Sequence, residues 1–150
     1  MPGGRDSPAG CDRLARRSRR TAMPHLGLLT VLVRDYDEAI RFYTEALGFT
    51  LAEDTALPGG ARWVVVRPDG AGPTGFLLAL AADPVELGRV GAQTGQRVFA
   101  FLHTEDFARD HARMSAAGVR FLEQPRVEVY GTVAVFEDLY GNRFDLIQPA

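Results

Sequence analysis

Side chains that could carry out chemistry are few in this sequence, and most lie far apart. The single cysteine, Cys11, excludes a disulfide within the chain and a cysteine-based zinc site. The three histidines, His25, His103 and His111, are interpreted as surface or structural residues rather than metal ligands. The sequence contains no serine in a nucleophile-elbow motif and no phosphate-binding loop. Asp145 is therefore the main candidate for a functional side chain.

Asp145 lies in a strand-like segment near the end of the chain. Strand alternation places Asp145 on one face together with Arg143 and Ile147. If this face is directed inward, Asp145 could accept a hydrogen bond from a ligand, bind a cationic group or act as a base. It could equally pair with Arg143 or with a neighbouring strand. Apolar surroundings would raise the pKa of the carboxyl group by desolvation, which suits a base.

Composition restricts the class of protein. The chain has 150 residues, of which 46% are hydrophobic and 24% charged, and its net charge is −2. These values are typical of one globular domain and argue against a nucleic-acid partner, which would need a basic surface. No apolar run approaches the roughly 18–20 residues of a membrane helix, so we expect no membrane partner. The apolar run 26–33 ends without a small-residue cleavage site, so we expect a cytoplasmic protein.

The chain divides into a tail and a duplicated domain. Residues 1–22 hold six Arg and two Asp with almost no large apolar residue, so we expect a disordered Arg-rich tail before a domain at 23–150. Within the domain, the predicted helix caps Asp35 and Asp106 lie 71 residues apart. The glycines that should end the same helices, Gly48 and Gly118, lie 70 apart, which indicates a duplication. Each half is predicted to have the order βαβββ, with module one at 25–82, a linker at 83–96 and module two at 97–149.

Two sequence patterns together resemble a known family. The first is D-x-x-x-A-x-x-F-Y-x-x-x-L-G-F, which begins at Asp35, and the second is D-x-x-G-N, which begins at Asp138. They resemble the vicinal-oxygen-chelate superfamily, which includes glyoxalase I, extradiol dioxygenases, fosfomycin-resistance enzymes and bleomycin-binding proteins. The resemblance covers about residues 25–149. It implies an α+β fold in which two βαβββ modules form a cup-shaped mixed sheet with helices on the outer face, and a homodimer.

The resemblance also indicates where a metal would bind. Metal-dependent members hold a divalent cation at four inward positions, and the cation acts as a Lewis acid on the substrate. The resemblance transfers these positions to Leu28, Ala79, Phe99 and Asp145. Because three of these side chains offer no lone pair, we expect no metal and no other cofactor. The cup is expected to be lined by the following residues: Leu28, Thr30, Ala79, Phe99, Phe101, Arg143 and Asp145.

A mostly apolar lining with few polar groups is typical of a small-molecule pocket. We therefore expect a metal-free binding protein that holds an aromatic or amphipathic compound in the cup. The alternative is an enzyme of the same superfamily, a glyoxalase- or epimerase-like lyase or a dioxygenase, with Asp145 as the catalytic residue. Phe99 is expected either to stack on a planar ligand or to fill the cup. Stacking is favoured because Thr30 and Asp145 would place polar groups near the ring.

Overall fold

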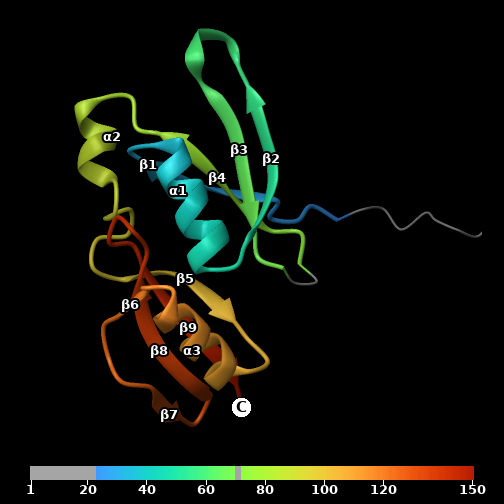
Figure 1. The fold of residues 1–150 in the computed structure, drawn as a ribbon, viewed down its shortest axis with the longest axis vertical. Helices are drawn as coiled ribbons and strands as arrows, with labels where there is room; N and C mark the ends of the chain where they lie inside the picture. Colours follow the sequence, from blue (N-terminus) through green and yellow to red (C-terminus); the bar gives the residue numbers. More distant parts are fainter. Residues whose placement is uncertain (1–22, 70–71) are drawn as a thin grey trace, which may run out of the picture.

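The computed structural model describes residues 23–69 and 72–150, which form two modules (Figure 1). The predicted tail at 1–22 lies outside the described residues. The elements of module one are β1 (Leu28–Val33), α1 (Tyr36–Arg41), the π-helical turn η1 (Phe42–Ala46), β2 (Thr50–Ala56), the 3-10 turn η2 (Pro58–Gly60), β3 (Arg62–Arg67) and β4 (Gly75–Leu80). A short helix, α2 (Pro84–Arg89), lies in the predicted linker. The elements of module two are β5 (Val98–His103), α3 (Phe107–Ala116), β6 (Arg120–Phe121), β7 (Arg126–Glu128), β8 (Gly131–Glu137) and β9 (Arg143–Pro149).

The strands form two mixed sheets with matching topology. The first sheet has the order β1-β4-β3-β2, and the second has the order β5-β9-β8-β6 with β7 paired to β8. In each sheet the first strand of the module runs parallel to its last strand, and the remaining pairs are antiparallel. The repeated order confirms the predicted α+β fold of two βαβββ modules.

The predicted helix signals are confirmed at both ends. The side chain of Asp35 accepts a hydrogen bond from the Glu38 amide at 2.8 Å, and Asp106 accepts one from the Arg109 amide at 3.1 Å. Gly48 and Gly118 end the helical segments with φ of 75° and 87°. This left-handed conformation favours glycine because a side chain would clash there.

The linker packs against the open edge of β1. The side-chain amide of Gln93 donates to the Thr30 carbonyl at 2.9 Å and accepts from the Leu32 amide. One glutamine side chain therefore occupies the place that a neighbouring strand would take. Among the residues that the structure describes, no strand pairs with this edge of β1.

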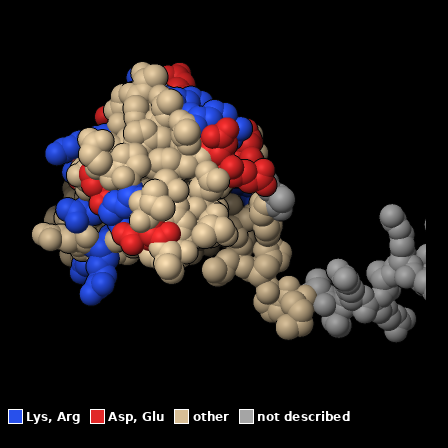
Figure 2. Space-filling model, turned by 90° about the horizontal axis from the view of Figure 1, so that it is seen from below, with Lys and Arg blue, Asp and Glu red and all other residues tan. Residues whose placement is uncertain are grey.

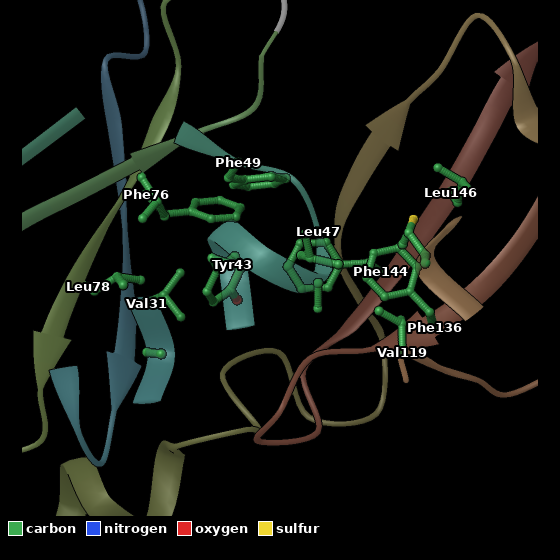
Figure 3. Close-up of a cluster of buried hydrophobic side chains, with 14 of the residues drawn as sticks. Val31, Tyr43, Leu47, Phe49, Phe76, Leu78, Val119, Phe136, Phe144 and Leu146 are labelled. Atoms are coloured by element: carbon green, nitrogen blue, oxygen red, sulfur yellow. The ribbon is translucent and has the colours of Figure 1, made fainter. Parts of the chain in front are cut away.

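The helix-covered faces of the two sheets share one core. Tyr43 of η1 lies between Phe76 of the first sheet and Phe144 of the second, with ring centroids 6.0 and 6.5 Å away (Figure 3). Tyr43 and Met114 are fully buried, as their helical spacing predicts. Since the helix-covered faces meet in this core, the opposite faces of both sheets point outward.

A buried carboxylate connects the final hairpin to module one. Oδ2 of Asp138 accepts hydrogen bonds from the Tyr43 hydroxyl at 2.7 Å and from Nδ2 of Asn142 at 2.9 Å. Oδ1 of Asp138 accepts the backbone amides of Tyr140 and Asn142, both at 2.9 Å. Burial and the nearby carboxylate raise the pKa of Tyr43 well above its usual value, so its hydroxyl remains a donor.

Candidate functional site

The candidate residues of module one lie on the outer face of the first sheet. In the β1–β4 ladder Thr30 pairs with Leu77 and Ala79 pairs with Leu32, so these side chains alternate with the core residues between them. Leu28 lies two residues before Thr30 and shares its face. Trp63 of β3 lies on the same side and is 37% exposed. We call this surface the module-one face: Leu28, Thr30, Trp63, Leu77 and Ala79.

The candidate residues of module two, apart from Phe99, lie on the outer face of the second sheet. Asp145 pairs with Phe101 on one side and with Val135 on the other, and Arg143 pairs with Glu137. The ring of Phe101 is 62% exposed. The Arg143 guanidinium donates to the Gln96 carbonyl at 2.9 Å. We call this surface the module-two face: Phe101, Val135, Arg143 and Asp145.

Phe99 does not lie beside Phe101 on that face. The β5–β9 register shifts between Val98 and Ala100, which leaves Phe99 at a β-bulge. Its ring packs against Phe76 and Phe144 in the shared core, with centroids 5.7 Å from each. A bulge inserts one residue and reverses the alternation that strand spacing assumes. Phe99 is thus partly buried against the core rather than exposed on the module-two face.

The candidate residues thus form two separate surfaces in one chain. The module-one face and the module-two face belong to different sheets, and both point away from the shared core. The strand patterns identify which residues share a face. They do not indicate how the two sheets are oriented, because contacts between distant residues such as Tyr43 and Asp138 determine it.

Asp145 has an unusual environment on the module-two face. Its Oδ1 is the one buried side-chain nitrogen or oxygen atom in the described ranges that lacks a hydrogen-bond partner. Burial raises the pKa of Asp145, attraction from Arg126 lowers it in part, and the charge of Glu123 raises it further. Arg126 is held by Glu123 at 3.0 Å and by Glu128 at 2.8 Å. The nearest cation is thus engaged with other carboxylates.

The metal positions transferred from the family do not fit a divalent cation. Leu28 and Ala79 lie on the module-one face, Phe99 lies in the core, and Asp145 alone offers a ligand atom. Within residues 23–69 and 72–150, no three His, Cys, Asp or Glu side chains cluster closely enough to hold a metal ion. His111 stacks between Phe107 and Phe121, with centroids at 5.4 and 4.1 Å, which is a packing role.

The structure contains an apolar cavity at the junction of the modules, and two predicted lining residues, Phe99 and Phe101, belong to its wall. It has a volume of about 380 Å³ and reaches from the start of β1 and β4 to the open edge of β5. Its lining includes Leu29, Phe49, Phe76, Phe99, Phe101 and Phe144. Phe101 belongs both to this lining and to the module-two face. No local pattern could identify the cavity, because its walls come from segments far apart in the sequence.

A family model describes most of the chain. The Glyoxalase/Bleomycin resistance protein/Dioxygenase superfamily model matches residues 23–146. The chain belongs to this superfamily, as the two sequence patterns indicated. In the described residues, no helix has the length and apolar character needed to span a membrane.

Individual relatives agree with this assignment. An uncharacterized protein of Shewanella frigidimarina (strain NCIMB 400) is 50% identical over 121 residues, which cover 80% of this chain and 90% of that protein. The crystal structure of UcmS2 superposes with a TM-score of 0.73 at 32% identity and covers 83% of this chain and 98% of UcmS2. TnmS3, an antibiotic binding protein from Streptomyces sp. CB03234, has a TM-score of 0.71 at 34% identity. The match covers 86% of this chain and 98% of TnmS3.

The environment of Asp145 leads to a stability prediction. We expect Asp145→Asn to increase the free energy of unfolding at pH 7 by at most about 1 kcal/mol, since a buried charged acceptor without a partner destabilises the fold. The folded-state pKa is raised above 3.8, so the destabilisation exists above the raised pKa and is relieved as the pH falls through it. The stability that Asp145→Asn gains over wild type should therefore decrease as the pH is lowered from 7 to 4, as measured by denaturant titrations. A variant that is less stable than wild type at pH 7 would contradict this assignment.

Proposed function

We propose that this protein binds a planar aromatic or amphipathic small molecule in the cytoplasm without using a metal. The observation that carries the proposal is the exposed ring of Phe101, which lies beside the Asp145 carboxylate and lines an apolar cavity of about 380 Å³. An exposed aromatic ring next to an apolar cavity is typical of a ligand-binding surface. The description of TnmS3 as an antibiotic binding protein supports the same class of function.

The proposed binding unit is a homodimer. Each chain carries a module-one face and a module-two face on different sheets, and a two-fold axis can bring one face of each copy together in two equal cups. Each cup would take Leu28, Thr30 and Ala79 from one copy and Phe101, Arg143 and Asp145 from the other. Exposed aromatic rings on the two faces, Trp63 at 37% and Phe101 at 62%, support association. Much of the surface seen from the end of module two carries neither Lys or Arg nor Asp or Glu (Figure 2).

Acridine, a planar tricyclic compound, provides a direct test of the binding function. Wild-type protein purified without chelator should bind acridine in a calorimetric titration, and binding should survive treatment with a chelator. Phe101→Ala should weaken binding about 5- to 150-fold, because it removes a stacking surface worth about 1–3 kcal/mol. Val85→Ala, which truncates a 73% exposed side chain on α2, should leave binding unchanged. Loss of binding with the chelator, or equal affinities in all three proteins, would refute the proposal.

The raised pKa of Asp145 favours a second candidate function, in which the carboxylate removes a proton from the bound molecule. Under this alternative the ligand would be altered by the protein. Mass spectrometry of the ligand after incubation in deuterated water distinguishes the two functions, because binding alone leaves its carbon-bound hydrogens in place.

A further inference from the structure

Asp138 and Asp145, two acidic side chains of module two, differ in how their oxygens are satisfied. Both oxygens of Asp138 are occupied, with four hydrogen bonds between them. Oδ1 of Asp145 is buried and accepts none. Buried polar atoms are nearly always paired, so an exception indicates a partner from outside the chain or a specific constraint. Asp145 faces outward from its sheet beside Phe101, and its side chain is partly exposed, so a bound molecule could reach the carboxylate.

The surrounding cations are engaged elsewhere. Arg126 pairs with Glu123 and Glu128, and Arg143 donates to the Gln96 carbonyl. Glu123 also accepts the Val135 amide at 3.1 Å, which fixes the Glu123–Arg126 pair on β8, next to Asp145. In the described residues neither arginine donates to Oδ1 of Asp145. The hydrogen bond that this oxygen lacks would come from outside the chain, from solvent or from a ligand.

The charge around Asp145 indicates what kind of donor is suitable. The carboxylates of Glu123, Glu128 and Asp145 outnumber the guanidiniums of Arg126 and Arg143 on this part of the face, so the group carries excess negative charge. On the same face Glu137 lies 3.7 Å from Arg120 and is balanced by it. A cationic donor would offset the excess and satisfy Oδ1, whereas a neutral donor would only satisfy Oδ1.

We propose that the ligand is a planar aromatic compound carrying a protonated amine, whose ring packs on Phe101 while the ammonium group pairs with the Asp145 carboxylate. This inference rests on the proposed function and specifies its ligand class. Phe101 and Asp145 are direct neighbours across β5 and β9, so a ring and its attached amine span the distance between them. The ring supplies apolar contact and the amine supplies selectivity, because a partly buried carboxylate interacts more favourably with a cation than with a neutral donor.

A matched pair of probes tests the inference. 9-Aminoacridine is a cation at pH 7.5, and acridine has the same three rings without the charge. Fluorescence titration should show that wild-type protein binds 9-aminoacridine at least tenfold more tightly than acridine. Asp145→Asn should abolish this preference and leave acridine affinity within about twofold. Glu137→Gln, which neutralises a balanced carboxylate on the same face, should keep the preference.

The outcomes separate this inference from the proposed function. The amine assignment would be overturned if wild type bound the two compounds equally well, or if the preference for 9-aminoacridine persisted in Asp145→Asn. In either case, binding of acridine by wild type would still support the proposed binding function. If wild type binds neither compound, both proposals fail. Thermal unfolding of each variant confirms that changes in affinity do not reflect loss of the fold.

Discussion

Replacing Asp138 by alanine is expected to lower the free energy of unfolding by about 3–5 kcal/mol. The substitution removes the acceptor of four hydrogen bonds and leaves the hydroxyl of Tyr43 and the amide of Asn142 buried without partners. These bonds hold the turn before β9 and connect it to η1 of the other module. The loss should therefore exceed that expected for an ordinary surface carboxylate.

Chemical denaturation at pH 7 measures this effect. Tyr43→Phe serves as the matched control, since it removes one donor to Asp138 and keeps the ring in the core, and it should cost only about 1 kcal/mol. A near-neutral Asp138→Ala would show that the carboxylate does not hold the hairpin against module one.

The second large effect is expected for Phe144→Ala, which should cost about 3–5 kcal/mol of unfolding free energy. Phe144 is 1% exposed, and its ring contacts Tyr43 and Phe76 of module one as well as Phe136 of module two. Truncation opens a cavity where the two sheets meet, so the loss includes packing across the modules.

Phe101→Ala is the control for this truncation, because Phe101 is in a neighbouring strand and 62% exposed. It should change the unfolding free energy by less than about 1 kcal/mol. Phe144→Leu keeps most of the side-chain volume, so its free energy of unfolding should lie between those of wild type and Phe144→Ala. This value can be measured even if the alanine variant does not fold. Equal losses for Phe101→Ala and Phe144→Ala would contradict the assignment of the two faces.

The fold is predictable from the sequence wherever its signals are local. The caps Asp35 and Asp106 and the glycines that end the helices act through their own backbone neighbours, so their spacing reveals the duplication. Strand alternation likewise places Asp145 on the face opposite the core residues Phe144 and Leu146, and burial raises its pKa as an apolar environment was expected to do.

Other features depend on contacts that local patterns do not encode. The bulge at Phe99 reverses one step of alternation and turns this residue away from Asp145, toward Phe76 and Phe144 at the wall of the apolar cavity. Gln93 replaces a strand at the edge of β1 through its side chain, and α2 lies in a segment expected to be a linker. The outward orientation of both candidate faces follows from how the sheets pack around Tyr43 and Phe144.

The most direct test of the shared binding site combines two disabled copies. Thr30→Arg should obstruct the module-one face and Phe101→Arg the module-two face, and both positions are exposed enough to tolerate the change. Each variant alone should fail to bind acridine, because every cup then contains one obstructed face. When the two are co-expressed in equal amounts, half of the dimers are mixed and each has one intact cup, so about a quarter of the wild-type binding capacity should return. Absence of any recovery, or full binding by either variant alone, would contradict a site built from two copies of this chain.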